Sequence, residues 1–532
     1  MGGSKPDSLE PKARSPLAEL LVVAAPVVMT MTSYTVMQFI DALMVTRIGD
    51  DDVYLAAQSN GGIVMWMTIA IMLGGASVIN TFVGQNLGAG RAERGAAYGW
   101  AGLYMALAWA LLMLPVAPLL GTLFSMAGHE GDLLAMETEY AQILFMGAFF
   151  TLASRNLAHF FYGMHRPMVV MIAAVTGNLV NVGANAVLIF GPEGAPSALP
   201  LAEVWMSIAS VLGIEALGVS GAAWGTVIGS AVELSIPLAL FLSPKYHRLF
   251  GTRSAWRLRW APIRDIIRIG WPGGLMLLSE LFCWSYLMVR LLPMGGAAAG
   301  EDPVVHNAAG WAALRYMHIA FMPVVGMQAA VTAVVGRYLG AGDQEAASHR
   351  AWLAMKISVA YMGTCAVAFV IFRESMIGVF AGERTPEEAS ELISIGAKVM
   401  IAAAVFQVFD AMAIIMQGAL RGAGDTVWPG VATLVTSWLF IVLGGHLLIE
   451  FAPGLGSIGP WIGGAAYIIA LGSLMVWRWQ GGRWRSIKLL DDEAAMAEGM
   501  GAAEAAGALP EYAATGSAAG RPQQPADPKS DA

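Results

Sequence analysis

The chain has 532 residues, of which 57% are hydrophobic and only 13% are charged, and its mean hydropathy is +0.61. Soluble domains carry about 25% charged residues, so this composition excludes an ordinary soluble protein. The net charge of -8 says little about partners, and both cysteines lie in apolar segments, which argues against a disulfide framework or a metal-binding cluster.

Long apolar segments follow one another along almost the whole chain. A membrane-spanning helix needs ~20 mostly apolar residues, and the sequence predicts twelve such spans. They lie near 17–46, 55–83, 95–122, 133–162, 167–190, 219–242, 263–293, 304–335, 345–372, 388–418, 427–449 and 457–479. The tail from about Asp491 is rich in Ala, Gly and Pro and is expected to be disordered.

The charges of the connecting loops alternate along the chain. Loops after even-numbered spans hold most of the basic residues, such as Arg91, Arg166 and Arg421, whereas loops after odd-numbered spans are mainly acidic. Basic loops stay on the cytoplasmic side. We therefore expect a multi-pass protein of the inner (cytoplasmic) membrane, with both termini in the cytoplasm.

The chain also repeats itself at an offset of 252 residues. GQNLGAGRAERGAAYGW, from Gly84, parallels GRYLGAGDQEAASHRAW, from Gly336. Two weaker echoes follow in the same order, Gly163 and Arg166 with Gly418 and Arg421, and a glycine series at the starts of spans 6 and 12. An ordered series of this kind predicts two six-helix halves of the same orientation, the parallel-repeat plan of secondary transporters. Glycine in these loops permits a positive φ and a tight turn into the next helix.

The expected fold is an all-α membrane protein with twelve transmembrane helices in two pseudo-symmetric six-helix lobes. The expected segments are a cytoplasmic N-terminal segment (1–16), a first lobe (17–243), a basic cytoplasmic linker (244–262), a second lobe (263–480) and a cytoplasmic, largely disordered tail (481–532).

Several segments resemble the MATE (multidrug and toxic-compound extrusion) transporters. They are VGQNLGAGR and VVGRYLGAGD after spans 2 and 8, QGALRGAGDT after span 10, NLVNVGANAVLIFG in span 5 and FIDALMVTRIGD at the end of span 1. Their order and spacing together are specific, and the resemblance covers about Leu17 to Lys488. It implies two lobes in a V shape and export of organic cations in exchange for Na+ or H+. The chain has no Walker A motif, so ATP is not expected to drive it directly.

Ionisable side chains inside a membrane are costly and are functional candidates by default. Asp41 lies deep in span 1, where the resemblance implies an acidic residue that binds a proton or Na+; a structural salt bridge is the alternative. Asn178, Asn181 and Asn185 share one face of span 5, and we expect them to face Asp41 or, alternatively, to form a polar seam between helices. Many prokaryotic MATE proteins have an Asp at the position of Asn185. Asn does not titrate, although its carbonyl oxygen can still bind Na+.

Span 7 and span 10 supply a second candidate pair, Glu280 and Asp410. The resemblance matches both positions to acidic residues of Na+-coupled bacterial members, in which a Tyr often stands at the position of Phe406; one hydroxyl ligand is therefore expected to be missing. Two carboxylates offer hard oxygen ligands for Na+, or they share a proton. The alternative is a salt bridge to Arg290, Arg315 or Lys398.

The predicted cation-coupling set is therefore Asp41, Asn181, Asn185, Glu280 and Asp410, with Asn178, Gln407 and Arg315 as candidate supporting residues. If the coupling ion is Na+, we expect it to bind at Glu280, Asp410 or Asp41. Arg315 is expected to neutralise one of the second-lobe acids when the cation is absent. Arg155 and Glu233 are expected to be structural or interfacial.

The resulting hypothesis is an antiporter, not an enzyme, which exports organic cations or drugs by alternating access with Na+ or H+ as the coupling ion and no other cofactor. Its expected partners are small organic cations and membrane lipid, with no nucleic acid, and the protein is expected to be a monomer. The alternatives are a flippase for lipid-linked oligosaccharides, which has a related fold and tends to have a cationic cavity, and a scaffold that does not transport.

Overall fold

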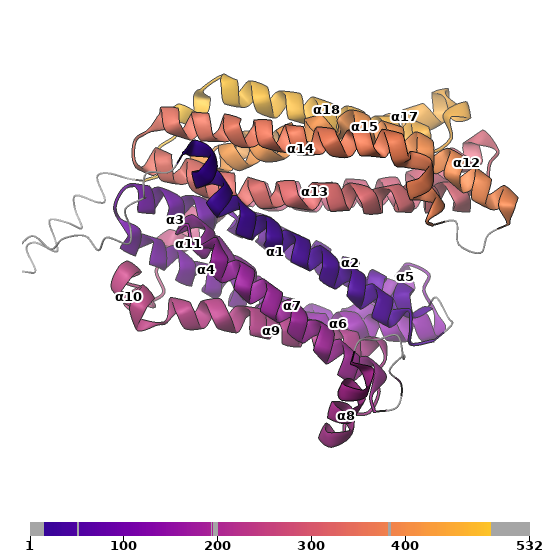
Figure 1. Cartoon of the computed structure of the whole chain (residues 1–532), viewed down its shortest axis with the longest axis horizontal. Helices are drawn as coiled ribbons and strands as arrows, with labels where there is room; N and C mark the ends of the chain where they lie inside the picture. Colours follow the sequence, from indigo (N-terminus) through magenta and orange to yellow (C-terminus); the bar gives the residue numbers. More distant parts are fainter. Residues whose placement is uncertain (1–14, 50–52, 193, 195–200, 381–384, 491–532) are drawn as a thin grey trace, which may run out of the picture. The chain divides into compact units, whose positions relative to one another are not determined.

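Residues 15–49, 53–192, 194, 201–380 and 385–490 are described by a computed structural model (Figure 1). Every regular element within these residues is helical. Residues up to Ile487 belong to one compact unit. The sequence before residue 15 and the tail from Asp491, for which disorder is predicted, lie outside the described residues.

The first half of the chain supplies six long helical segments. They are α1 (Pro16–Val45), α2 with α3 (Val53–Ala76 and Val78–Gly88), α4 with α5 (Ala92–Met113 and Leu120–Met126, joined by the 3₁₀ turn Leu114–Leu119), α6 (Gly131–Gly163), α7 (Pro167–Phe190) and α9 (Val219–Phe241). Two short helices, α8 (Ala202–Leu212) and α10 (Pro244–Phe250), lie in the connections after α7 and α9.

The second half supplies six more long segments. They are α11 with α12 (Trp260–Tyr286 and Leu292–Ala299, joined by the π-helical turn Leu287–Leu291), α13 (Pro303–Gly340), α14 (Gln344–Gly378), α15 (Pro386–Ala423), α16 with α17 (Val427–Thr436 and Gly444–Phe451, joined by the π-helical turn Ser437–Leu443) and α18 (Ile458–Gln480). The chain then turns through Arg483–Ser486, where the buried Trp484 ring stacks on Trp479.

These twelve segments coincide with the twelve predicted spans to within a few residues, and the all-α, two-lobe fold is confirmed. Eleven helical segments of the described residues are long and apolar enough to cross a membrane. The twelfth, α6, has 33 residues and is less apolar because it carries Glu137, Glu139 and Arg155. It nevertheless packs against α2, α4 and α9 inside the first lobe.

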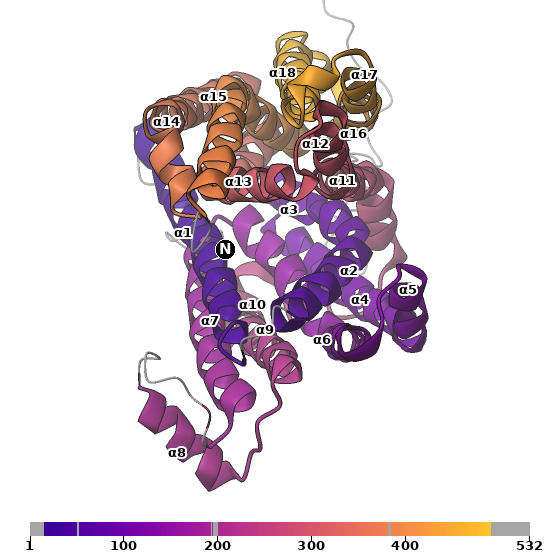
Figure 2. The same ribbon diagram turned by 90° about the vertical axis from the view of Figure 1, so that its right-hand side faces the viewer.

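The first helix of each half contacts both lobes. Near its start α1 packs on α13 and α14, and farther along it packs on α7. In the same way α11 packs on α2, with Gly270 and Gly273 against Gly75 and Gly74, and it also packs on α16, with Pro272 against Gly430. The two lobes, indigo to magenta and salmon to yellow, can be followed in Figures 1 and 2.

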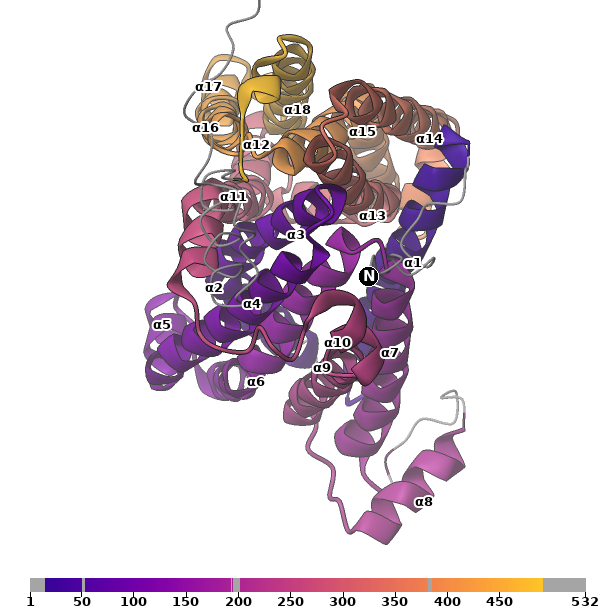
Figure 3. The same ribbon diagram turned by 90° about the vertical axis from the view of Figure 1, so that its left-hand side faces the viewer.

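The lobes meet at the end of the bundle that carries the duplicated LGAG turns, called the basic end here (Figure 3). Gly88 closes α3 and Gly340 closes α13, and a methyl group at either would overlap a backbone carbonyl of the other helix, that of Arg337 or of Gln85. The duplicated glycines therefore let the two halves pack backbone to backbone. The turns that follow use Gly90 (φ +73°) and Gly342 (φ +81°), as the sequence predicts.

Candidate functional site

The first lobe contains a cluster of buried polar side chains around Asp41. The residue lies on α1, its side chain is buried, and its Oδ1 accepts a 2.8 Å hydrogen bond from Nδ2 of Asn185 on α7. Tyr140 of α6 lies close enough to interact with the Asp41 carboxylate. No ion pair joins Asp41 to a basic side chain among the described residues, so the salt-bridge alternative is not supported.

The three asparagines of α7 face α1 and α9, as their spacing predicts. Asn178 donates to Ser33 Oγ of α1 at 2.6 Å. Asn181 is 1% exposed, and neither its Oδ1 nor its Nδ2 has a hydrogen-bond partner in the part of the chain described; Oδ1 of Asn185 is buried without a partner as well. Two buried amide oxygens of α7, one on Asn185 beside Asp41 and one on Asn181 a helical turn away, therefore have hydrogen-bonding capacity to spare.

Glycines of α9 bring this asparagine face close to its neighbour. A side chain at Gly225 would overlap Oδ1 of Asn185, and one at Gly229 would collide with Cβ of Asn181. Small residues allow such close approach between helices in lipid. The arrangement of the polar cluster around Asp41 thus depends on the close packing of α7 on α9 as well as on the polar residues themselves.

A second polar cluster lies in the same lobe. Glu233 of α9 accepts hydrogen bonds from the Tyr34 hydroxyl (2.5 Å) and from Ser154 (2.8 Å). The Arg155 guanidinium lies 3.8 Å from the centre of the Tyr34 ring and interacts electrostatically with Glu233. Arg155 and Glu233 thus belong to one buried network that joins α1, α6 and α9.

In the second lobe, Glu280 of α11 and Asp410 of α15 lie close enough for their charges to interact. Oε1 of Glu280 accepts a 2.5 Å hydrogen bond from the Tyr467 hydroxyl of α18. Asp410 makes no side-chain hydrogen bond within the described residues. The hydroxyl expected to be missing at Phe406 is thus supplied to the acidic pair from another helix.

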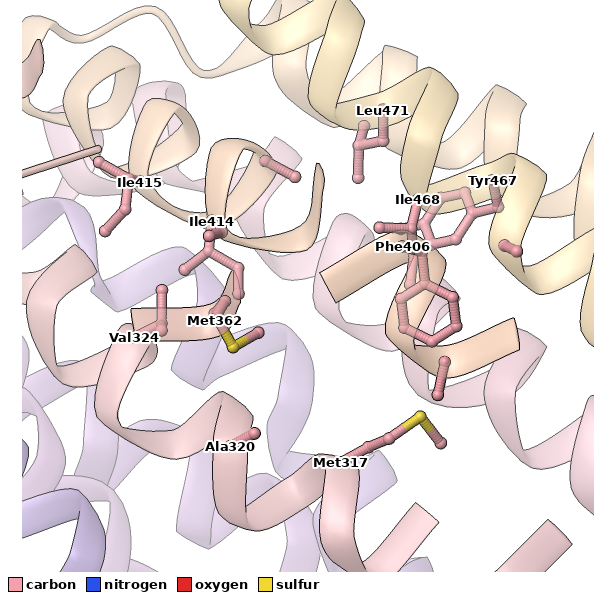
Figure 4. Close-up of a cluster of buried hydrophobic side chains, with 14 of the residues drawn as sticks. Met317, Ala320, Val324, Met362, Phe406, Ile414, Ile415, Tyr467, Ile468 and Leu471 are labelled. Atoms are coloured by element: carbon pink, nitrogen blue, oxygen red, sulfur yellow. The ribbon is translucent and has the colours of Figure 1, made fainter. Parts of the chain in front are cut away.

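The Tyr467 ring, whose hydroxyl contacts Glu280, lies in an apolar cluster. Phe406 and Tyr467 are buried in one hydrophobic cluster with Met317, Ile468 and Leu471 (Figure 4). Gln407, the candidate supporting residue on α15, is 1% exposed, and its Nε2 has no partner among the described atoms. An acidic pair in such surroundings has few competing polar partners in protein.

The structure does not bring Arg315 to the acidic pair. Its side chain is exposed on α13, and no ion pair links Arg290, Arg315 or Lys398 to Glu280 or Asp410 within the residues described. The basic residue whose charge acts on Glu280 is Arg421, near the end of α15. The sequence analysis assigned Arg421 to a loop and did not consider it as a neighbour of the site.

Polar contacts also join the lobes at the basic end. Glu19 near the start of α1 accepts hydrogen bonds from Arg350 Nε (2.8 Å) and from the Tyr338 hydroxyl (2.8 and 2.9 Å). Asp265 near the start of α11 accepts from the Tyr98 hydroxyl of α4 at 2.9 Å. Each contact joins the first helix of one half to the other half, and Tyr98 and Arg350 are equivalent at the 252-residue offset.

His165, between α6 and α7, makes a further contact between the lobes. Its Nε2 lies 3.2 Å from the Ala333 carbonyl oxygen of α13, so the neutral ring donates its Nε2–H. Burial, reinforced by the nearby Arg337 charge, lowers the pKa of His165 to about 4. The sequence analysis missed His165, Glu19 and Asp265, since only long-range packing shows that they reach the opposite half.

The curated relatives are multidrug resistance proteins. The probable multidrug resistance protein NorM of Mesorhizobium japonicum is 26% identical over 480 residues, which cover 88% of this chain and 94% of that protein. The multidrug resistance protein NorM of Burkholderia vietnamiensis is 28% identical over 465 residues, or 86% and 92% of the two chains.

Solved structures share the fold. A MOP superfamily transporter from Pyrococcus furiosus has a TM-score of 0.77 at 19% identity, and a MATE protein in the straight conformation has a TM-score of 0.76 at 20% identity; each match covers 91% of this chain and all of the other. The MatE family profile matches residues 26–187 and 276–445, which together are more than half of the chain. The protein belongs to the MatE family of membrane transporters.

Proposed function

We propose that the protein is a multidrug efflux transporter of the cytoplasmic membrane, which exports organic cations by alternating access in exchange for Na+ or H+. The NorM relatives support drugs as cargo. The loop charges support placing the basic end in the cytoplasm, since the loops there hold most of the basic residues. In this structure the lobes meet at that end, the arrangement expected of an outward-facing state.

The observation that carries the proposal is a set of carboxylates inside the bundle that make no contact with a basic side chain among the described residues; Asp41 is buried, and Glu280 and Asp410 are half-buried. Asp41 is held by the neutral Asn185, and Glu280 by the neutral Tyr467. An uncompensated carboxylate inside a membrane is costly. A proton or a sodium ion supplies the missing charge, and we propose that these acids bind the coupling ion.

The donors around Asp41 suit a hard cation. The Asp41 carboxylate contacts Asn185, and Asn181 lies one helical turn from Asn185 on the same face of α7; neither amide oxygen has a protein partner in the described residues. Oxygen ligands of this kind match Na+, whereas a proton needs the carboxylate alone. The polar cluster around Asp41 therefore suits either coupling ion. Asn181 is required only for the binding of sodium.

We propose organic cations as the cargo because Asp41, Glu280 and Asp410 are acidic and aromatic faces attract cations. A flippase for lipid-linked oligosaccharides is the second candidate. It is kept because the Pyrococcus furiosus neighbour, which has the same fold, is described as having reverse polarity of its binding pocket, so the fold does not decide the cargo.

The test is dye efflux from proteoliposomes in which a Na+ gradient and a pH gradient are imposed separately. Only one gradient should accelerate efflux. Asp41→Asn, Glu280→Gln and Asp410→Asn should abolish the acceleration, and Asn181→Ala should impair it only if Na+ is the driving ion.

Two acids outside the proposed sites give matched controls. Glu374→Gln changes an exposed acid on α14, and Glu137→Gln changes a buried acid that already contacts His129 and Asn60. Both should keep gradient-driven efflux. Wild-type efflux in all three site variants would overturn the proposal. Flipping of a lipid-linked sugar without any dye efflux would favour the second candidate.

A further inference from the structure

The short helix α8 (Ala202–Leu212) has no counterpart in the second half of the chain. Residues 191–218 connect α7 to α9, and α8 lies within them, whereas the equivalent connection from α17 to α18 spans only 452–457. The pseudo-symmetric bundle is therefore complete without α8, and the helix needs an explanation of its own.

The side chains of α8 divide into three faces. One face packs toward the lobe: Ala209 is buried, and the Trp205 ring lies against Gly183 of α7. A second face is polar and consists of Glu203, Ser207 and Ser210. The third face is apolar and exposed. It consists of Val204, Ile208, Val211 and Leu212, which are 48%, 36%, 85% and 63% exposed.

The position of α8 indicates what covers this apolar face. Figures 1 and 2 show the helix beyond the ends of α7 and α9 that lie opposite the basic end, with its axis running across theirs. The helices on either side of α8 also carry exposed apolar side chains, namely Leu179 on α7, Trp224 and Ile228 on α9, and Leu217 just before α9. In a membrane-spanning bundle this outer surface is in contact with lipid.

We propose that α8 is an interfacial helix, whose apolar face (Val204, Ile208, Val211 and Leu212) inserts among the acyl chains of the leaflet at the end opposite the basic end. A helix lying in the membrane plane places its apolar face in lipid and its polar face in water. Glu203, Ser207 and Ser210 then face the aqueous side, and Trp205 lies at the level where Trp is enriched in membrane proteins.

The charges of this segment specify the lipid chemistry. Residues 201–218 contain no Lys or Arg, and their charged residues are Glu203 and Glu215. Many interfacial helices use basic residues to bind anionic lipid. Here the apolar face alone holds the helix in the membrane, so insertion does not require anionic headgroups.

Site-directed spin labelling tests the proposal on the full-length chain. Single cysteines are introduced at Val211 and Ser207 after Cys283 and Cys365 have been replaced by Ala, and the protein is reconstituted in phosphatidylcholine vesicles. Collision with oxygen, which partitions into lipid, is compared with collision with a water-soluble nickel chelate. Leu179→Cys on α7 serves as the lipid reference and Glu215→Cys as the aqueous reference, since both side chains are exposed.

The label at residue 211 should match the lipid reference, and the label at residue 207 should match the aqueous reference. The ratio of oxygen to nickel accessibility should therefore be several-fold higher at residue 211 than at residue 207. Addition of phosphatidylglycerol should leave both ratios unchanged. High nickel accessibility at both positions would overturn the proposal, because α8 would then stand in water. Protection of residue 211 from both reagents would overturn it too, because protein, such as a second copy of this chain, would then cover the face.

Discussion

Tyr467 provides a test of the proposed ion-binding role of Glu280. It donates to Glu280 at 2.5 Å from a different helix, and hydrogen bonds to charged groups contribute about 1.5–3 kcal/mol. In Tyr467→Phe the half-saturating concentration of the coupling ion should change by about tenfold. It should fall if the ion is H+, since the carboxylate loses a donor that a proton replaces. It should rise if the ion is Na+, since an oxygen ligand is lost.

Efflux measured against ion concentration checks this prediction. Tyr361→Phe, the same change at an exposed position of α14, should leave the concentration dependence as in the wild type. An unchanged value in Tyr467→Phe would mean that Glu280 does not bind the coupling ion.

Sequence reasoning found the acidic side chains but not all their partners. Asp41, Glu280 and Asp410 could be predicted because a charge within an apolar span is conspicuous. The link between Asn185 and Asp41 followed from helical spacing. Tyr467 could not be predicted in this way, because an aromatic residue in a span is ordinarily packing and its contact with Glu280 depends on how α11 and α18 pack.

At the scale of elements, the spans were predictable because their apolar runs are long and glycine turns separate them. The helix α8 was missed. Its 11 residues are too few for a span, so a search for membrane-spanning segments passes over it, although its polar residues gather on one side of the helix. The role of the LGAG repeat was only half predicted. Its positive-φ turn was expected, but the backbone contact between lobes depends on the packing of α3 on α13.

That contact yields a prediction for these two helices. Gly88→Ala places a methyl group onto the Arg337 carbonyl, so α3 and α13 cannot approach as closely, and the lobes should separate at the basic end. Spin labels at the equivalent positions Glu93 and Glu345, in the background without native cysteines, should report a longer distance. Gly62→Ala, where a β-carbon meets open space, should leave the distance unchanged. Equal distances in both variants would show that this packing does not set the lobe arrangement.

For the molecule as a whole, paired contacts hold the two halves together. The side chains of Glu19 and Arg350 are 16% and 13% exposed. Their ion pair is therefore intermediate between exposed ion pairs, which contribute little to stability, and buried ion pairs, whose disruption costs several kcal/mol. Glu19→Gln should therefore weaken the present arrangement by about 1–2 kcal/mol and add a longer component to the Glu93–Glu345 distances. Exchange of the charges, Glu19→Arg with Arg350→Glu, should restore the shorter distance. Failure of the exchanged pair would show that Glu19 does not act through the ion pair.

The same arrangement should depend on pH through His165. Its pKa is about 4 while the lobes enclose it, and about 6.5 for a histidine in water. Above pH 6.5 the ring is neutral in both states and pH has no effect. As pH falls from 6.5 toward 4, the separated state binds a proton that the present state does not, which favours separation by about 1.4 kcal/mol for each pH unit. Below about pH 4 the effect levels off.

Labels at Glu93 and Glu345 should therefore report more separated molecules at pH 5.5 than at pH 7.5, by a factor of about ten. The acids proposed to bind the coupling ion would also respond to pH, so a variant that changes only the histidine is needed. His165→Asn tolerates the positive φ of 54° and does not titrate. Its amide is too short to replace Nε2 at the Ala333 carbonyl, so the comparison is between the pH responses of the two proteins and not between their distances at a single pH. If the wild type and His165→Asn respond equally to pH, the response arises from the acids. If only the wild type responds, the histidine between the lobes links the pH at the basic end to the separation of the lobes.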